Sequence, residues 1–260
     1  MNAYTQDCIC LLGDSLTQGG WEPHGFAQRL SYVYARKLDV INRGLSGYNT
    51  EWAIPVFEQF FAKSKDQEHL PKVQLLTIWF GANDACIPPS PQHVPLPTFS
   101  ANLSKLINLV KSPDSPYHSP STRVILITPP PVNTYQRGAD LATRNPPLDL
   151  DRKFEVTQQY AEAVKEVGAK EGVPVVDIWS SIWEAAGKVE RDLSRYLNDG
   201  LHLNAEGYTF VYDGLLKTIS ESYPEIHPDN LEFVFAPWAD VANAADRSQA
   251  LRKRDAFLRK

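Results

Sequence analysis

A serine near the start of this chain and a histidine near its end have the residue types of a nucleophile and its base. Ser15 lies in the segment Gly13–Leu16, which directly follows a short apolar run. Asp199 and His202 lie three positions apart in a later segment. A serine hydroxyl becomes nucleophilic when an imidazole nitrogen accepts its proton. In a turn, Asp199 can fold back to Nδ1 of His202 and leave Nε2 free to accept that proton. These residues predict acyl transfer through a covalent serine intermediate.

Each of these segments also has an ordinary structural explanation. A serine at the end of a strand is more often a turn residue or a helix N-cap. An isolated Asp-x-x-His is more often a turn aspartate beside a packed histidine. The prediction of catalysis therefore depends on the two segments occurring together.

Attack on a carbonyl creates an oxyanion that needs preorganised hydrogen-bond donors, and two further segments offer them. The segment Asn42–Gly47 follows an apolar run, and a glycine there lets a backbone N–H approach a ligand without a Cβ in the way. Asn83 follows another apolar run and can donate from its side-chain amide. Glycine and asparagine are also preferred in left-handed turns, which is the alternative explanation for both segments.

These residues must be positioned by the elements around them, and the chain alternates short apolar runs with longer segments of helical periodicity. This alternation indicates parallel β-α-β units. The predicted strands are 8–12, 40–42, 73–80, 123–128 and 173–178, and the predicted helices are 26–37, 52–63, 99–111, 152–170 and 205–219, the last with Asn204 as its N-cap. Residues 75–80 are hydrophobic nearly throughout, as in strands buried on both faces. We predict an α/β fold, a three-layer α/β/α sandwich around a five-stranded parallel sheet.

The four segments with candidate catalytic residues, those of Ser15, Asn42–Gly47, Asn83 and Asp199 with His202, resemble in order the conserved blocks of the SGNH hydrolases, also called GDSL esterases and lipases. The resemblance implies the flavodoxin-like α/β/α fold of that superfamily. It also implies that Ser15 is the nucleophile, His202 the general base and Asp199 the residue that orients it. The implied oxyanion hole consists of the N–H groups of Ser15 and Gly44 and the side chain of Asn83.

Within that superfamily, local patterns are similar to the isoamyl acetate-hydrolysing esterases at Gly81–Cys86, Val94–Pro97 and Asp199–His202. The implied function is a serine esterase that hydrolyses short-chain carboxylic esters, such as acetate esters of small alcohols, without a cofactor. A deacetylase of acetylated sugars or a thioesterase would use the same site, and a non-enzymatic binding module is the more distant alternative. The chain lacks a Gly-x-Ser-x-Gly elbow, which disfavours the α/β-hydrolases.

Apolar residues near the predicted strand ends are candidate walls of a substrate pocket. We expect substrate contacts from Trp52, Cys86, Ile87, Pro130 and Val132, and further candidates are Trp21, Trp79, Phe80 and Pro131. For Trp52 and Trp79, core packing is the stronger alternative, since tryptophan is well buried on average. Asp14 and Asp84 also match block positions, and we expect them to hold loops by accepting backbone N–H bonds. No metal site is predicted, because no metal-ligand spacing occurs near these segments.

The composition of the chain argues against nucleic acid and anionic lipid as partners. With 260 residues, 43% of them hydrophobic, and a net charge of -5, it has the composition of an ordinary globular domain and no field that attracts nucleic acid or anionic lipid. No apolar run approaches the ~18 residues that span a bilayer. Three cysteines, Cys8, Cys10 and Cys86, predict buried free thiols in a reducing compartment, so we expect a cytoplasmic location.

The end of the chain continues beyond the last predicted core helix. We expect residues 1–222 to form the hydrolase domain and residues 223–260 to form a C-terminal extension. Its apolar residues include Leu231, Phe233, Val234 and Phe235. The extension is expected either to wrap its own domain or, as the resemblance implies, to join a homodimer.

Overall fold

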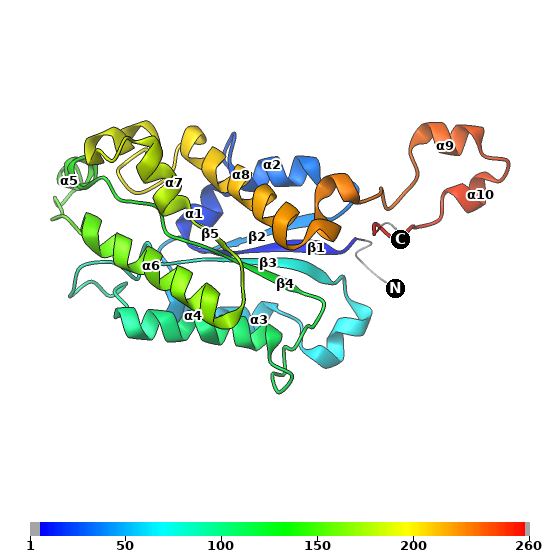
Figure 1. Cartoon of the computed structure of the whole chain (residues 1–260), viewed down its shortest axis with the longest axis horizontal. Coiled ribbons are helices and arrows are strands. Elements are labelled where there is room, and N and C mark those ends of the chain that lie inside the picture. The colour runs from blue at the N-terminus through cyan, green and yellow to red at the C-terminus, as the bar shows by residue number, and fades with distance from the viewer. Residues whose placement is uncertain (1–5, 258–260) are drawn as a thin grey trace.

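A single parallel sheet organises the chain, for which a computed structural model describes residues 6–257. The strands are β1 (Cys8–Gly13), β2 (Asp39–Gly44), β3 (Val73–Trp79), β4 (Arg123–Ile127) and β5 (Val175–Val176). They lie in the order β2-β1-β3-β4-β5, and each pairs in parallel with its neighbours. Helices cover both faces of the sheet (Figure 1), which confirms the predicted three-layer α/β/α fold.

Strand side chains alternate between two hydrophobic clusters, one on each face of the sheet. In β1, Ile9 and Leu11 belong to the cluster on one face, and Cys10 and Leu12 belong to the cluster on the other. The first cluster includes α2 (Phe26–Val33), α7 (Ile178–Ala185) and α8 (Ala205–Ser222), and the second includes α3 (Thr50–Phe60), α4 (Leu96–Lys111) and α6 (Phe154–Glu171). The remaining helices are α1 (Ser15–Gln18), α5 (Thr134–Ala142), α9 (Trp238–Asn243) and α10 (Arg247–Ala250), with 3-10 turns at Gly19–Trp21, Ser64–His69, Glu190–Arg195, Pro224–Ile226 and Pro228–Asn230.

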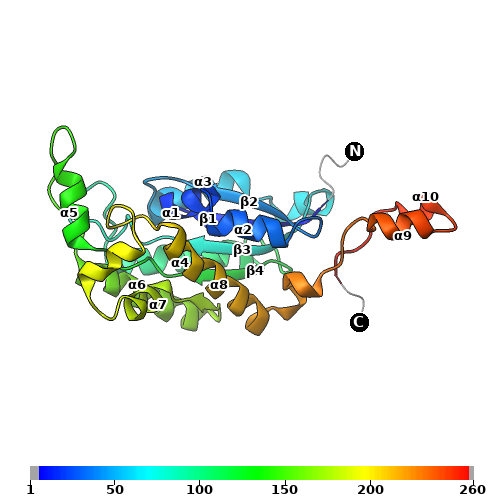
Figure 2. The ribbon, with the colours of Figure 1, turned by 90° about the horizontal axis from the view of Figure 1, so that it is seen from above.

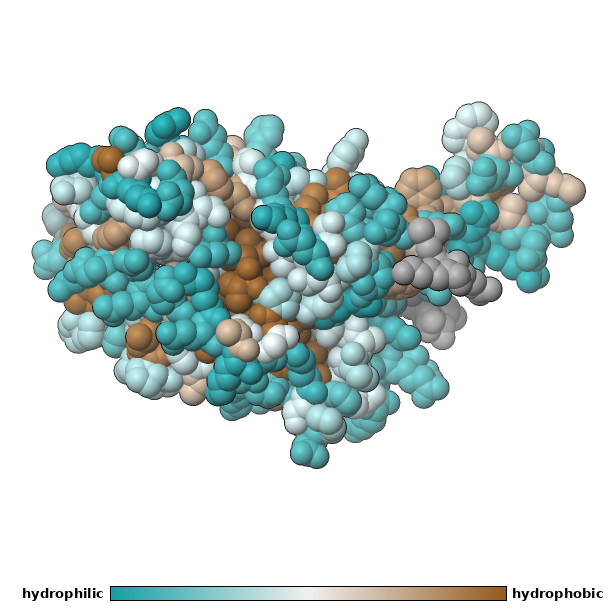
Figure 3. Space-filling view, viewed as in Figure 1, coloured by the Kyte–Doolittle hydropathy of each residue, from teal (hydrophilic) through white to brown (hydrophobic). Residues whose placement is uncertain are grey.

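The fifth strand is much shorter than the predicted 173–178. Gly172 adopts a left-handed conformation that ends α6, and the N–H of Val173 donates to the carbonyl of Gly168. Asp177 already caps α7 by accepting the N–H of Ser180, so only Val175 and Val176 are left to pair with β4. Figure 3 shows hydrophobic residues gathered between α6 and α8, where β5 forms the edge of the sheet.

The start of α8 agrees with the sequence analysis, whereas α3 begins two residues before the predicted 52. Asn204 accepts the N–H of Gly207 at 3.0 Å and begins α8, as predicted. The predicted helix from Arg152 begins two residues later, at Phe154, because Lys153 before it has an extended backbone. Among residues 6–257, no helix combines the length and the apolar character needed to cross a lipid bilayer.

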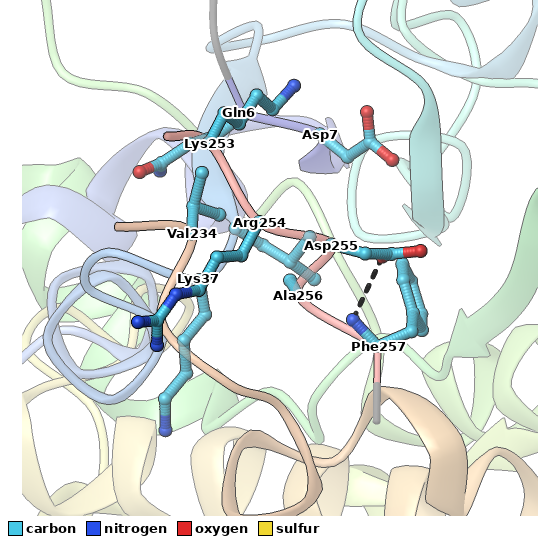
Figure 4. Close-up of a pocket in the computed structure, with 10 residues that line it drawn as sticks. Gln6, Asp7, Lys37, Val234, Lys253, Arg254, Asp255, Ala256 and Phe257 are labelled. Atoms are coloured by element: carbon cyan, nitrogen blue, oxygen red, sulfur yellow. Dashed lines mark hydrogen bonds between the residues drawn. The ribbon is translucent and has the colours of Figure 1, made fainter. Parts of the chain in front are cut away.

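The chain after α8 first packs against the sheet domain and then leaves it. Leu231 and Val234 are buried in the cluster that contains α2 and α8, and the N–H of Val234 donates to the carbonyl of Arg36 at 2.8 Å. The chain returns to this segment near its end, since the N–H of Arg254 donates to the carbonyl of Val234 at 2.7 Å, and residues 231–234 and 254–257 together form the base of the extension. A cavity of about 280 Å³ lies at this base, lined by Lys37 and Val234 together with residues 253–257 (Figure 4). Beyond the base, α9 and α10 form an arm that extends away from the sheet (Figures 1 and 2).

Candidate active site

Ser15, His202 and Asp199 come together at the carboxyl edge of the sheet. β1 ends at Gly13, and Asp14 caps α1 by accepting the N–H of Leu16 at 2.9 Å, which places Ser15 at the first position of the helix. The Oγ atom of Ser15 lies 3.0 Å from Nε2 of His202. Nδ1 of the same ring lies 2.9 Å from Oδ2 of Asp199. A hydroxyl, an imidazole and a carboxylate are thus joined in one hydrogen-bonded series.

The loop before α8 folds Asp199 back onto His202. Oδ1 of Asp199 accepts the N–H groups of Leu201 and His202 at 3.1 and 2.8 Å. Gly200 has a positive φ of 84°, and a Cβ there would lie 2.4 Å from the backbone nitrogen of Arg137. Only glycine therefore allows this loop to approach α5 so closely.

Electrostatics determines which nitrogen of His202 carries the proton. Burial alone would raise the pKa of the Asp199 carboxyl, but hydrogen bonds from the ring and backbone of His202 and from the N–H of Leu201 outweigh it and hold this pKa well below its ordinary value. The ionised carboxylate can only accept hydrogen bonds, so Nδ1 of His202 is the protonated nitrogen. Nε2 is then the acceptor that faces the hydroxyl of Ser15.

The three predicted oxyanion donors lie in different hydrogen-bonding environments. The N–H of Ser15 is at the start of α1 and has no partner within the part of the chain that the structure describes. Asn83 donates one amide hydrogen to the carbonyl of Tyr48 at 2.8 Å and keeps a second one available. The N–H of Gly44, however, already donates to Oδ1 of Asn42 at 2.8 Å.

Gly44 is a glycine for a packing reason. A Cβ at this position would lie 2.0 Å from the backbone nitrogen of Gln18, so β2 approaches α1 too closely for any side chain. Gly47, three residues further on, has a positive φ of 81°, and no residue in the described range 6–257 accepts its N–H. Its neighbour Tyr48 holds the Asn83 amide, which places Gly47 beside that amide. The sequence analysis did not select Gly47, because two glycines in one segment differ only in the backbone geometry that the fold gives them.

Asp14 and Asp84 hold loops, as predicted. Asp14 accepts the N–H of Leu16, and Asp84 accepts the N–H and the hydroxyl of Thr50 at 2.9 and 2.6 Å. Both carboxyls are fully buried, and desolvation raises the pKa of Asp14 to about 7 and that of Asp84 to about 6. Their second oxygens have no hydrogen-bond partner among residues 6–257.

A cavity of about 500 Å³ opens at the serine and histidine, and it is polar. Its lining consists of Ser15, Gln18, Gly19, Trp21, Glu22, Ser46 and His202. Of the residues that the sequence analysis proposed as pocket walls, Trp21 lines this cavity. The five expected substrate contacts do not line it, and these are Trp52, Cys86, Ile87, Pro130 and Val132.

The side chains of Cys86, Pro130 and Val132 are buried in the fold, which keeps them from the surface of this cavity. Trp52 is 38% exposed and packs edge-on against Tyr48, so the core packing expected as its stronger alternative is wrong. For Trp79 that expectation is confirmed, because its side chain is buried and donates Nε1–H to the carbonyl of Thr128.

Two arginines that no sequence pattern singled out also reach the site. Nη1 of Arg137 lies 3.0 Å from Oδ2 of Asp199, and Nη2 of Arg152 lies 2.8 Å from Oδ1 of Asn83. Neither arginine occurs in a recognisable motif, so only their positions in the fold identify them.

The remaining candidates for special chemistry are the three cysteines. Cys8, Cys10 and Cys86 are free and buried, which confirms the predicted state of these thiols. Burial raises the pKa values of Cys8 and Cys10 to about 12, so both are protonated and unreactive at neutral pH. Within residues 6–257, no group of three or more His, Cys, Asp or Glu side chains has an arrangement that could hold a metal ion.

The sequence profile of the GDSL-like Lipase/Acylhydrolase family matches residues 11–210, a range that contains every residue of the site described above. The chain belongs to this family. It is similar to an isoamyl acetate-hydrolyzing esterase 1 homolog of Bos taurus, with 35% identity over 238 residues, which cover 91% of this chain and 88% of that protein. It is also similar to an isoamyl acetate-hydrolyzing esterase of Saccharomyces cerevisiae, with 31% identity over 240 residues, which cover 89% of this chain and 93% of that protein. The GDSL protein described here is therefore a carboxylester hydrolase, and the resemblance drawn from its four segments is confirmed.

Solved structures share the fold of this GDSL hydrolase. A lipase/acylhydrolase from Enterococcus faecalis superposes with a TM-score of 0.59 at 24% identity, over 83% of this chain and 96% of that chain. An acetyl xylan esterase superposes with a TM-score of 0.61 at 14% identity, over 81% and 98%. At these identities the similarity concerns the arrangement of the sheet and helices.

Proposed function

We propose that this GDSL hydrolase is a serine esterase that cleaves short-chain carboxylic esters, in particular acetate esters of small alcohols. Ser15 is the nucleophile, His202 the general base and Asp199 the residue that orients the imidazole. The observation that carries the proposal is the unbroken series of 3.0 Å from Ser15 Oγ to His202 Nε2 and 2.9 Å from His202 Nδ1 to Asp199 Oδ2.

The reaction follows from the proton positions in this series. Oγ of Ser15 attacks the ester carbonyl carbon while its proton moves to Nε2 of His202. The bond from the carbonyl carbon to the alcohol oxygen then breaks, and His202 returns the proton to the departing alkoxide. A water molecule attacks the acyl-serine with His202 again as base, and the carboxylic acid leaves as Ser15 regains its proton. Asp199 stays ionised throughout.

The negative charge on the carbonyl oxygen needs donors that are already in place. We assign this role to the N–H of Ser15, the N–H of Gly47 and the second amide hydrogen of Asn83. Gly47 replaces the Gly44 of the sequence prediction, because the N–H of Gly44 is bonded to Asn42. Each donor of this kind contributes about 2.7–4 kcal/mol to transition-state stabilisation.

Two substrate classes are compatible with this site. The names of the relatives from Bos taurus and Saccharomyces cerevisiae, together with their coverage of the chain, support isoamyl acetate and similar small esters. Acetylated sugars are the second candidate, because the cavity offers the polar side chains of Gln18, Glu22 and Ser46 beside the half-exposed ring of Trp21. Such a lining can hydrogen-bond sugar hydroxyls and pack against the face of a sugar ring.

The first experiment measures hydrolysis of p-nitrophenyl acetate, butyrate and octanoate by the wild-type protein and by Ser15→Ala and His202→Ala. Both substitutions should lower kcat by about 10³–10⁶-fold. An active-serine phosphonate should add one label to the wild-type mass and none to Ser15→Ala. Comparable turnover in Ser15→Ala would refute the nucleophile assignment.

A panel of isoamyl acetate, an acetylated sugar and an acyl thioester separates the substrate classes and includes the thioesterase alternative. The highest kcat/KM on isoamyl acetate supports the small-ester assignment, and the highest value on the acetylated sugar moves the assignment to a deacetylase. Folded protein with neither turnover nor label would favour a binding module.

We also propose that the arm joins two copies of the chain, while its base belongs to its own domain. Trp238 on α9 is 83% exposed, and the neighbouring Phe235 and Leu251 are also exposed, whereas Leu231 and Val234 at the base are buried. Large exposed apolar side chains on a protruding segment favour a protein partner. Trp238→Ser should lower the mass measured by light scattering, and Tyr32→Ser, an equally exposed aromatic residue on α2, should not. An unchanged mass in both variants would exclude a role of the arm in assembly.

A further inference from the structure

A series of four alternating charges connects the two halves of the candidate active site. Nη1 of Arg137 donates to Oδ2 of Asp199 at 3.0 Å, and its Nε and Nη2 donate to the two carboxylate oxygens of Asp151 at 3.2 and 2.9 Å. Arg152 donates to the same carboxylate through Nη1 and to Oδ1 of Asn83 through Nη2 at 2.8 Å. The series therefore runs from the carboxylate that holds His202 to the amide assigned to the oxyanion hole.

The interior of the protein makes these pairings obligatory. The Arg152 side chain is 2% exposed and that of Arg137 is 10% exposed, and a buried charge is stable only when it is paired and hydrogen-bonded. Nε of Arg152 is also engaged, by the carbonyl of Ala82 at 2.7 Å. Burial alone would raise the pKa of Asp151, but its two arginine partners outweigh that effect and lower it, so the bridging carboxylate is charged. Removal of Asp151 would leave the buried guanidinium of Arg152 without a carboxylate partner among the described residues.

Arg152 determines which end of the Asn83 amide faces the substrate. A guanidinium can only donate hydrogen bonds, so it must face the oxygen of the amide and not the nitrogen. Nε2 of Gln92 donates to the same oxygen at 3.3 Å. The nitrogen of Asn83 is consequently directed to the carbonyl of Tyr48 and to the site, where it can donate to an oxyanion. A flipped amide would place its NH₂ against the donors of Arg152.

Arg137 acts on the other half of the site. It donates to Oδ2 of Asp199, the same oxygen that accepts the Nδ1–H of His202, while the loop backbone holds Oδ1. This arginine lies on α5, the helix against which Gly200 packs. The carboxylate is thus fixed by donors on both of its oxygens.

We propose that Arg137 and Arg152, bridged by Asp151, are positioning residues that hold the Asp199 carboxylate and the Asn83 amide in their reactive orientations together. The inference rests on the proposed function of Ser15 as a nucleophile. It assigns the segment that precedes α6, which carries Asp151 and Arg152, to the catalytic apparatus.

A double-mutant cycle in the full-length protein tests the coupling between Arg152 and Asn83. Arg152→Met should lower kcat on p-nitrophenyl acetate by about 10²–10³-fold, as loss of an oxyanion donor does, with KM changed by no more than about threefold. In the Asn83→Ala background the same substitution should lower kcat by no more than about threefold further, because Arg152 acts through the amide. A purely structural arginine would give effects on kcat that multiply.

A second cycle pairs Arg137→Met with Asp199→Ala and has the same expected non-additivity. Arg144→Met is the matched control, because Arg144 lies just after α5, is exposed and pairs only with Asp140 among the described residues. This control should change kcat by no more than about twofold. Where Arg152→Met does not fold, Arg152→Lys replaces it in the cycle, since an ammonium group retains the charge but cannot hold Asp151 and Asn83 in a planar fork.

Multiplicative effects in both cycles, or a change confined to KM, would overturn the inference. The two proposals fail in different ways. Wild-type turnover in Ser15→Ala overturns the proposed function and the inference with it, whereas an inactive Ser15→Ala together with multiplicative cycles overturns the inference alone.

Discussion

Replacing Asp199 with asparagine tests the proton arrangement of the site with a minimal change in shape. The carboxylate accepts four hydrogen bonds, from the N–H groups of Leu201 and His202 on one oxygen and from the His202 ring and Arg137 on the other. An asparagine has one oxygen and one NH₂ for these two positions. The question is which position the NH₂ occupies.

The hydrogen bonds decide this orientation. If the NH₂ faced the loop, it would meet two backbone N–H donors and both of their bonds to residue 199 would be lost. If the NH₂ faces His202 instead, both loop bonds are kept and only the bond from Arg137 is lost. Arg137 still pairs with Asp151 in that case. The second orientation is therefore the stable one. It places a donor opposite Nδ1, so the proton of the ring moves to Nε2 and the imidazole can no longer accept the proton of Ser15.

A wrong histidine tautomer in a serine hydrolase lowers kcat by about 10⁴-fold, which corresponds to about 5 kcal/mol of lost transition-state stabilisation. We expect this loss for Asp199→Asn on p-nitrophenyl acetate, with KM nearly unchanged and a normal melting temperature. Asp140→Asn is the matched control, because Asp140 contacts the same Arg137 at 3.6 Å but does not contact His202. It should lower kcat by no more than about fivefold, since a partly exposed ion pair contributes at most about 1 kcal/mol. A kcat for Asp199→Asn within tenfold of the control would refute the assigned tautomer.

Three further predictions concern the two glycines and a buried carboxyl. Gly47→Ala should fold, because a Cβ at this position contacts nothing closer than Gln92 at 3.4 Å. Strain at the positive φ should nevertheless displace the N–H of residue 47 and lower kcat by about 10²-fold, as measured by steady-state kinetics. Gly44→Ala should yield little folded protein in circular dichroism, because its Cβ would overlap backbone atoms of Gln18. Burial raises the pKa of Asp14 to about 7 from its ordinary value of about 4, so the folded state prefers the neutral carboxyl. The neutral Asp14 carboxyl therefore stabilises the folded state fully below pH 4, and this stabilisation is lost as the pH rises through 7. In urea titrations between pH 4 and pH 8, the free energy of unfolding of the wild type should fall relative to that of Asp14→Asn. A difference that stays constant with pH would contradict this prediction.

The parts of the fold that follow from local patterns were predictable. Apolar runs identified all five strands, and the side-chain cap Asn204 identified where α8 begins. The fifth strand was overestimated, because an apolar sequence does not reveal that a helix end and the next helix cap already use its neighbours. Trp52 was misjudged for a similar reason, since the exposure of a large side chain depends on which face of α3 the sheet covers.

In the candidate site too, some residues were predictable from local sequence patterns and others depend on the fold. Ser15, Asp199 and His202 were predictable because their chemistry needs particular residue types, and a turn brings two of them together. The proposed choice of Gly47 over Gly44 was not predictable, because it depends on which N–H already has a partner in the fold.

The charged series was the least accessible part of the site, and the reason is physical. Arg137 lies 14 positions from Asp151 and 62 positions from Asp199, so no local spacing relates the groups that it joins. Arginine and aspartate side chains are usually solvated, and only the burial that the fold imposes brings these ones together. The same burial gives the series its consequence for catalysis. Since Arg137 and Arg152 share the Asp151 carboxylate, the carboxylate beside His202 and the amide assigned to the oxyanion hole are joined by one hydrogen-bonded series, although 116 positions of sequence, from 83 to 199, lie between them.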